Sequence, residues 1–357
     1  MTYDVLQSDA SITSDSHRIE LAVMFNPNTV EVPLTVNDTQ PTGNYDSVKI
    51  AVFGAGGVGG YFGGRLALAG AEVHLIARGA HLEVLRQDDL RVKSVFGDFE
   101  VSLPATDDPS DIGPCDYVLF TVKSFDTEVA ASELQPLLHD DTAVISLQNG
   151  LDNEERLAAE IGRGHVMGGV AYIFSTIAEP GVIEHTGGPA SLIHGELDGD
   201  RSDRALRFQT WCERAEGMEA ELSDAVHTAL WDKAVFICAQ AGMTATVRLP
   251  LGEIRSREAS WRMYRQIMEE VFNVAKATGV ELPDGTVDKW VEFANELDGD
   301  AYSSLHYDLT HDKPMEIEAL HGEVVRRGQE HEVDVPMNEA VYAILQPWAE
   351  RNQQERQ

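Results

Sequence analysis

Short apolar runs alternate with amphipathic stretches through the first half of the chain, beginning at residue 48. The apolar runs have the length of strands and occupy residues 48–53, 72–77, 116–122 and 142–147. Stretches with helical periodicity follow them at 58–69, 80–88, 125–138 and 152–161. Uninterrupted apolar runs are typical of strands that are buried on both faces, as in a parallel sheet. The alternation therefore predicts a doubly wound parallel sheet with helices on both faces.

The pattern changes after about residue 223. Before that point, further strands are predicted at 90–96, 98–103, 166–174, 181–186 and 190–196, with a helix near 201–216. Beyond it, strand signals give way to long helical stretches at 224–246, 257–278, 284–297, 313–331 and 336–350. The predicted fold class is α/β, with an N-terminal sheet domain and a C-terminal all-helical domain.

The chain of 357 residues has the length of two ordinary domains and an appendage. Residues 1–47 are polar and rich in Asp, Ser, Thr and Asn. They are predicted to be a partly disordered N-terminal extension, to which no role is assigned. The change of pattern places the sheet domain at 48–222 and the helical domain at 223–350.

The net charge of the chain limits the classes of partner that it can bind. The sequence holds 27 Lys and Arg against 60 Asp and Glu, which gives a formal net charge of −33. A surface this negative repels the phosphate backbone of nucleic acids and anionic membranes, so neither is an expected partner. Such a charge is tolerable where salt screens it, which favours a halophile-like protein of a salty cytosol. An acidic protein of an ordinary cytosol is the alternative.

Further features predict a cytoplasmic protein without a metal site. No apolar run is long enough to span a bilayer, and the first residues are acidic and polar, unlike a secretory signal. The three cysteines, Cys115, Cys212 and Cys238, are odd in number and lack close spacing. They predict a reducing compartment, and neither a disulfide framework nor a zinc site.

A glycine-rich motif follows the first predicted strand directly and opens a helix. It comprises Gly54, Ala55, Gly56, Gly57, Val58 and Gly59. In a Rossmann-type dinucleotide site, the first glycine permits a tight turn, the second lets the backbone approach a pyrophosphate, and the third lets helix and strand pack closely. The helix N-terminus adds free N–H groups and a positive dipole end. A turn that merely needs glycine is the alternative, and the order of strand, motif and helix favours the dinucleotide site.

The end of the second strand indicates which dinucleotide binds. An NAD site usually has an Asp or Glu there, about 20 residues past the motif, to bind the ribose hydroxyls. This chain has Arg78 at that place. A planar guanidinium suits a 2′-phosphate, which favours NADP over the alternative of a solvated loop arginine. Lys123, after the strand 116–122, is a second candidate for the cofactor site, although an ordinary surface lysine is nearly as good an interpretation.

Two more polar residues are candidates for chemistry. Asn149 follows the strand 142–147 and so lies at the carboxyl edge of the sheet, where ligands bind. It can hold a nicotinamide or a substrate oxygen, or simply form an Asn-Gly turn. Lys233 precedes the apolar helical run 234–239. Partial desolvation there lowers the pKa of a lysine and suits it to proton transfer, whereas a lysine that reaches out to water is the plainer interpretation.

Taken together, five stretches of the chain resemble the ketopantoate reductases (2-dehydropantoate 2-reductases). They are the motif 54–59, Ala77-Arg78-Gly79, Gln148-Asn149-Gly150, Leu230-Trp231-Asp232-Lys233, and the pair 303–308 with 316–322. The segments 169–173 and 180–185 also fit the family. The resemblance extends from Lys49 to about Asn338, roughly four-fifths of the chain.

The resemblance implies an NADPH-dependent reduction of ketopantoate to (R)-pantoate, for the pantothenate and coenzyme A route. By this resemblance, Lys233 supplies a proton to the ketone oxygen, and Asn149 places the nicotinamide and the substrate. Ser304 binds the carboxylate region of the substrate. Glu316, expected in the first turn of a helix that follows Ser304, hydrogen-bonds the substrate hydroxyl. A homodimer through the helical domain is expected on the same ground. Without the resemblance, Ser304 and Glu316 are typical of a cap and a charge near a helix start.

The lysine helix departs from the family pattern. The family usually carries asparagines four and eight residues after the lysine, where this chain has Ile237 and Ala241. Gln240, at a neighbouring helical position, is a candidate to compensate for them. A site that binds a hydroxyl discriminates strongly, so the change bears on the substrate more than on the reaction. Two alternatives therefore stand beside ketopantoate. One is a reductase of a different 2-oxo acid, and the other is a non-catalytic dinucleotide-binding regulator.

Overall fold

The computed structural model describes residues 47–356. A ten-stranded sheet has the order β4-β3-β9-β8-β7-β6-β1-β2-β5, and β10 pairs with β9. The strands are β1 (Lys49–Phe53), β2 (Glu72–Ile76), β3 (Leu90–Ser94), β4 (Phe99–Val101), β5 (Ala105–Thr106), β6 (Tyr117–Phe120), β7 (Ala143–Ser146), β8 (Val166–Glu179), β9 (Val182–Glu196) and β10 (Glu219–Leu222).

Five neighbouring strands, β8, β7, β6, β1 and β2, run parallel in the middle of the sheet. β6 and β7 are buried along their whole length, and β1 is buried from Ile50 onwards. Their carboxyl ends meet at one edge, which is where an α/β sheet binds its ligands. The predicted parallel sheet is confirmed. The predicted strands at 90–96 and 98–103 correspond to β3 and β4, which are antiparallel partners.

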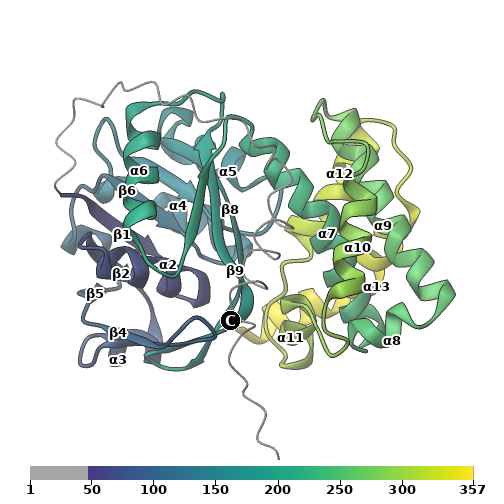
Figure 1. The fold of residues 1–357 in the computed structure, drawn as a ribbon, viewed down its shortest axis with the longest axis horizontal. Helices are drawn as coiled ribbons and strands as arrows, with labels where there is room; N and C mark the ends of the chain where they lie inside the picture. Colours follow the sequence, from purple (N-terminus) through teal and green to yellow (C-terminus); the bar gives the residue numbers. More distant parts are fainter. Residues whose placement is uncertain (1–46, 357) are drawn as a thin grey trace, which may run out of the picture. The chain divides into compact units, whose positions relative to one another are not determined.

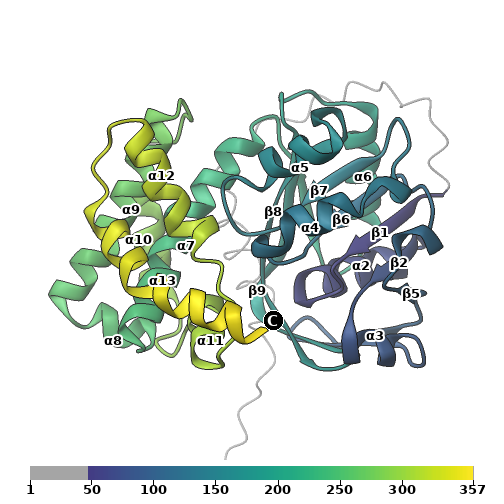
Figure 2. The same ribbon diagram turned by 180° about the vertical axis from the view of Figure 1, so that it is seen from behind.

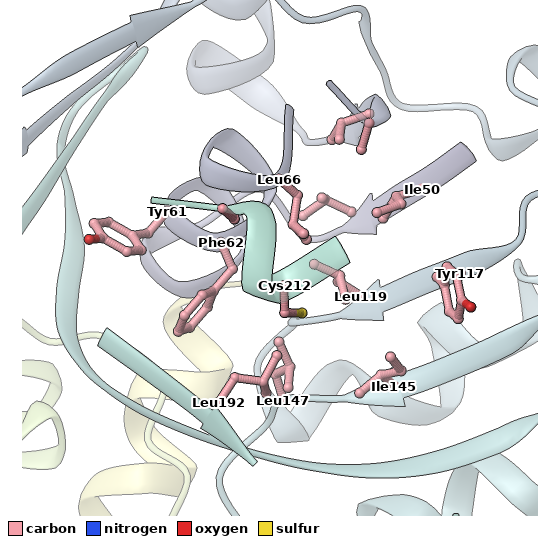
Figure 3. Packing of buried hydrophobic residues seen from close by; sticks show 14 of the residues in the cluster. Ile50, Tyr61, Phe62, Leu66, Tyr117, Leu119, Ile145, Leu147, Leu192 and Cys212 are labelled. Carbon is pink, nitrogen blue, oxygen red and sulfur yellow. The ribbon is translucent and has the colours of Figure 1, made fainter. Parts of the chain in front are cut away.

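Helices cover both faces of the sheet (Figures 1 and 2). They are α2 (Gly57–Leu68), α3 (Gly79–Leu85), α4 (Thr127–Ser132), α5 (Asn153–Ile161) and α6 (Asp203–Arg214). On one face, Phe62 of α2 and Cys212 of α6 pack over strand residues such as Leu119 (Figure 3). On the other face, Leu157 of α5 belongs to a second apolar cluster, with Phe120 of β6. Each face thus buries its own cluster, as the uninterrupted strand pattern requires.

β8 and β9 form a long antiparallel hairpin. The sequence pattern predicts three separate strands here, because Gly187 and Gly188 resemble a turn. In the structure Gly188 has a φ of +81°, and register shifts occur between Tyr172 and Ser175. These bulges bend the hairpin without ending its strands. The sequence pattern does not predict β10, because its four residues, Glu-Ala-Glu-Leu, lack a clear apolar run.

The rest of the chain is helical. It contains α7 (Val226–Val247), α8 (Leu251–Arg255), α9 (Glu258–Ala277), α10 (Thr286–Glu296), α11 (Ser304–Thr310), α12 (Glu323–Glu330) and α13 (Pro336–Arg356). α7 contacts α9, α10, α11 and α13, and also β8 and β9. Because it has neighbours on several sides, α7 is apolar around most of its circumference. It connects the helical region to the edge of the sheet.

Two predicted helices are shorter than their sequence patterns. The stretch 125–138 contains α4 between two 3₁₀ turns, Ser124–Asp126 and Gln135–Leu137. Pro136 lacks the backbone N–H that a continuous helix needs. The stretch 313–331 becomes helical only at a π-helical turn, Glu318–Gly322, which continues as α12.

Several features limit the kinds of site in the described part of the chain. No helix within 47–356 is long and apolar enough to cross a membrane. Across the same residues, no group of three or more His, Cys, Asp or Glu side chains is placed to hold a metal ion. The three cysteines are buried and unpaired. The predicted extension 1–47 lies outside the described residues except for Ser47.

Candidate active site

The glycine motif forms the turn between β1 and α2. The N–H groups of Gly54 and Ala55 both donate to the carbonyl oxygen of Ile76 at the end of β2, at 3.1 and 2.9 Å. Gly54 has a φ of +102°, and a Cβ atom there would lie 2.9 Å from the backbone nitrogen of Val122. A Cβ atom at Gly59 would lie 2.6 Å from the carbonyl oxygen of Gly54. The first and third glycines are therefore required by the turn and by its packing.

The middle of the motif leaves room for a ligand. A Cβ atom built on Gly56 would meet only the carbonyl oxygen of Gly54, at 4.0 Å. Gly56 precedes α2, which has no side-chain cap and no acidic residue in its first turn. An uncapped helix N-terminus beside open space suits a phosphate group. These residues fit the pyrophosphate of a dinucleotide.

Arg78 lies two positions after the end of β2 and is the N-cap residue of α3. Its guanidinium donates to both carboxylate oxygens of Glu133, at 3.1 and 3.3 Å, through the same nitrogen. The side chain is 57 % exposed. A guanidinium has five N–H donors, so Arg78 keeps donors for a further anion. Glu133 partly neutralises its charge, and its assignment to a 2′-phosphate stays a prediction.

Lys123 lies after β6 and reaches across to the helical region. Its ammonium donates to Asp308 Oδ2 at 3.2 Å and to Glu316 Oε2 at 3.1 Å. The other oxygen of Glu316 accepts the N–H of Ser124 at 2.9 Å. The two carboxylates raise the pKa of Lys123 against the opposing effect of burial. The charge of Lys123 is thus engaged within the protein, and its predicted contact with the cofactor stays a prediction.

Asn149 and Lys233 meet directly, although 84 positions separate them. The Lys233 ammonium donates to Asn149 Oδ1 and to the carbonyl oxygen of Ala171, both at 2.8 Å. Asn149 follows β7, and its own carbonyl accepts the side-chain amide of Asn153 at 3.0 Å. Gln148 holds the same loop in place, because its side-chain amide donates a hydrogen bond to the carbonyl oxygen of Val122 at 3.0 Å. The sheet edge therefore holds the lysine through two fixed oxygen atoms.

This contact leaves Lys233 with a defined donor. A protonated lysine has three N–H donors, and the oxygens of Asn149 and Ala171 accept two of them. Burial lowers the pKa of Lys233 to about 8, while the negative charge of Glu316 acts in the opposite direction. A group with a pKa near neutrality, and with one N–H left over, suits proton donation to an oxygen atom.

Ser304 and Glu316 stand in different surroundings. Ser304 is exposed as the first residue of α11, whose cap is Ser303. Glu316 is buried, and the attraction of Lys123 and the N–H of Ser124 lower its pKa although burial acts to raise it. The expectation that Glu316 lies in the first turn of the helix that follows Ser304 is wrong. α11 ends at Thr310, and the next helical turn begins after Glu316, because Pro314 interrupts the segment.

The α7 face that carries Lys233 continues with apolar side chains. Ile237 is half-buried and Ala241 is buried, at four and eight positions beyond the lysine. Helical spacing places all three on one face. The amide oxygen of Gln240 accepts the hydroxyl of Tyr264 at 3.1 Å. The amide oxygen of Gln240 thus already has a partner within the helical region. This contact argues against Gln240 as a replacement for the missing asparagines.

Several groups that contact the candidate site residues were not predicted from the sequence. The carbonyl oxygen of Ala171 is a backbone atom, so no side-chain pattern marks it. Asp308, which accepts a hydrogen bond from Lys123, lies inside a segment that carries the family resemblance, but the resemblance gives it no role. Ser124 acts through its N–H on Glu316, which lies 192 positions away.

A separate cavity of about 510 Å³ does not belong to this site. It is lined by Leu151, Glu155, His227, Thr228, Trp231, Thr278, Gly279, Val280, Glu281 and Arg327. Its arginine already binds Glu323 and Glu155. Neither Lys233 nor the glycine motif lines it.

Comparison with known proteins identifies related sequences over most of the chain. The family described as ketopantoate reductase PanE/ApbA matches residues 50–199, and the C-terminal part of the same family matches 225–349. The chain is 31% identical to the 2-dehydropantoate 2-reductase of Halobacterium salinarum over 295 residues, which cover 81% of this chain and 95% of that protein. It is 29% identical to an uncharacterized oxidoreductase, YkpB of Bacillus subtilis, over 84% of this chain and 98% of that protein.

A solved structure agrees with these matches. The PanE/ApbA family ketopantoate reductase of Ralstonia eutropha superposes with a TM-score of 0.79 and 35% sequence identity. The superposition covers 85% of this chain and 99% of that one. The likeness therefore extends over both the sheet and the helical region.

Gly56 and Gly57 provide a matched pair of substitutions for the dinucleotide site. We expect Gly56→Ala to keep the melting temperature of the parent, because its Cβ meets open space. The same variant should weaken NADPH binding by roughly tenfold or more, because the methyl group occupies the room for the pyrophosphate. Gly57→Ala should lower the melting temperature, because its Cβ collides with the carbonyl oxygen of Ser175.

Thermal melting and fluorescence titration with NADPH, in one buffer, measure both effects. Unchanged NADPH affinity in Gly56→Ala would contradict the placement of the pyrophosphate at this turn.

Proposed function

The chain belongs to the ketopantoate reductase family, and we propose that it reduces ketopantoate to (R)-pantoate with NADPH, for the pantothenate and coenzyme A route. Members of this family are oxidoreductases. The observation that carries the proposal is the pair of 2.8 Å hydrogen bonds that hold Lys233 between Asn149 and Ala171. They hold the ammonium group beside the loop after β7, at the carboxyl edge of the sheet, which is where sheets of this kind bind their ligands.

The residues of the sheet edge would hold the cofactor. Residues 54–59 would bind the pyrophosphate with backbone N–H groups, and Arg78 would bind a 2′-phosphate. Asn149 would place the nicotinamide ring beside Lys233. When bound, NADPH supplies the hydride for the ketone carbon. The protein itself contributes orientation, exclusion of water and the proton.

Lys233 would donate its third N–H to the ketone oxygen of the substrate. As negative charge develops on that oxygen, the proton moves from Nζ to it. The neutral amine that remains has two N–H groups, which match the oxygens of Asn149 and Ala171. No buried donor loses its partner in the step, so the same contacts stabilise the lysine before and after proton transfer.

Glu316 and Ser304 would bind the rest of the substrate. Both oxygens of Glu316 already accept hydrogen bonds, from Lys123 and from the N–H of Ser124. A carboxylate has about four lone-pair positions, so Glu316 can accept a substrate hydroxyl as well. The exposed hydroxyl of Ser304 would serve the substrate carboxylate.

The apolar face of α7 favours a second candidate, a reductase of a different 2-oxo acid. Ile237 and Ala241 offer no hydrogen bond on the side of α7 that carries Lys233. A 2-oxo acid with an apolar side chain would suit these residues better than the hydroxyl of ketopantoate does.

A panel of 2-oxo acids, assayed with NADPH at high potassium chloride, tests the proposal. We expect the highest kcat/KM for ketopantoate, because Glu316 can accept its hydroxyl. A clear preference for an apolar 2-oxo acid would instead establish the second candidate. NADPH binding without turnover of any acid would refute both and leave a dinucleotide-binding regulator.

Lys233 makes the reaction sensitive to alkaline pH. The lysine must be protonated to act as the acid, and its pKa is lowered to about 8. We therefore expect kcat/KM to stay level below that pH and to fall about tenfold per pH unit above it. Lys233→Ala should abolish turnover and leave NADPH affinity nearly intact. An unchanged rate in Lys233→Ala would remove this residue from the mechanism.

Substitutions of Arg78 and of its partner Glu133 together test whether the site prefers NADPH to NADH. Arg78→Ala should raise the KM for NADPH by roughly tenfold or more, because it removes charge-assisted hydrogen bonds, and should change the KM for NADH little. Glu133→Gln should lower the KM for NADPH, because it frees the guanidinium from its carboxylate partner. Equal effects of Arg78→Ala on both cofactors would argue against a 2′-phosphate contact.

A further inference from the structure

Tyr172 lies beside the lysine that the proposed function requires. It follows Ala171 on β8, and the carbonyl oxygen of Ala171 accepts a hydrogen bond from Lys233. The Lys233 nitrogen lies 5.6 Å from the centre of the Tyr172 ring. The tyrosine is only 7% exposed. An aromatic ring thus adjoins the ammonium group at a place from which water is largely excluded.

The face of an aromatic ring attracts a cation, because its quadrupole is negative there. Such a contact extends to about 6 Å from the ring centre and is stronger where water is excluded. Burial acts against the charge of Lys233. The ring therefore supplies part of the stabilisation that water would otherwise give to the ammonium group.

We propose that Tyr172 is a positioning residue for Lys233: its ring holds the ammonium group in place and in its charged form, ready to donate a proton. The inference rests on the proposed function for its catalytic meaning. Asn149 and Ala171 fix two hydrogens of the ammonium group, and the ring adds a contact that depends on charge alone. Tyr172 itself need not touch the substrate.

The charged groups near Lys233 stabilise its ammonium form only in part, so the Tyr172 ring can contribute. The negative charge of Glu316 also favours the charged form of Lys233. Asp232 precedes Lys233 in sequence, but both of its oxygens accept hydrogen bonds from Lys289 at 2.7 Å. Glu316 in turn is shared with Lys123. Removal of the ring would leave burial opposed mainly by a carboxylate that another lysine partly neutralises.

Phe236 provides a matched control on α7. It is buried, like Tyr172, and lies three positions after Lys233. Its ring stacks on Trp290 with a centroid distance of 5.0 Å and meets Phe293 edge to face. Phe236→Leu therefore removes a buried aromatic ring that packs in an apolar cluster. Any loss of stability from truncation appears in both leucine variants, whereas a change at Lys233 is specific to Tyr172.

The experiment compares Tyr172→Leu, Tyr172→Phe and Phe236→Leu with the parent chain. Acetic anhydride reacts with the neutral amine, so mass spectrometry of labelling at Lys233 across pH gives the midpoint of its titration. We expect a midpoint near pH 8 in the parent. In Tyr172→Leu the midpoint should move down by roughly half a pH unit or more. The pH above which kcat/KM falls should shift by the same amount. Tyr172→Phe keeps the ring, so it and Phe236→Leu should retain the parental midpoint.

A midpoint in Tyr172→Leu that equals the midpoint in Phe236→Leu would overturn the proposal. Should Tyr172→Leu not fold, Tyr172→Met provides the same test with a flexible apolar chain. The labelling needs no turnover, so it decides the role of Tyr172 even if no 2-oxo acid is reduced. Failure of the proposed function is then seen separately, as absence of turnover in the parent chain.

Discussion

The hydrogen bond between Lys233 and Asn149 joins the two parts on which the proposed chemistry depends. Asn149 belongs to the loop after β7, and Lys233 belongs to α7, the central helix of the helical region. A proton donor on a mobile surface side chain would have a pKa near 10 and no fixed direction. Here two oxygen atoms fix its direction, and burial brings its pKa close to neutrality. The rest of the site is arranged around this fixed ammonium group.

A chain of close contacts connects this lysine to the glycine turn. Gln148, next to Asn149, binds the carbonyl oxygen of Val122, and the same Val122 lies against Gly54. The segment continues into Lys123 and Ser124, which bind Glu316. The proposed phosphate, hydride and proton sites are thus held by one contiguous set of loops at the carboxyl edge of the sheet. Small side-chain changes in these loops are therefore expected to alter binding and turnover together.

The sequence allowed the parallel sheet and the glycine turn to be predicted, because each depends on local pattern or on the order of strands. It marked Asn149 and Lys233 only as separate candidates, whose roles the family resemblance implied, and their direct contact was not predicted. It did not allow the partners of Lys123 to be predicted, since Asp308 and Glu316 lie 185 and 193 positions away. Backbone atoms such as the oxygen of Ala171 carry no sequence signal. The helix expected around Glu316 failed because Pro314 outweighs the helical periodicity of its neighbours.

The most direct test of the account is a crystal structure of the chain with NADP⁺ and a non-reactive 2-oxo acid analogue such as oxamate. We expect Lys233 Nζ to keep Asn149 and Ala171 as partners and to donate its remaining hydrogen to the analogue's oxygen in the ketone position. That oxygen should lie within about 3.2 Å of the nitrogen. A bound analogue whose corresponding oxygen faces another donor, with Lys233 out of reach, would contradict the account.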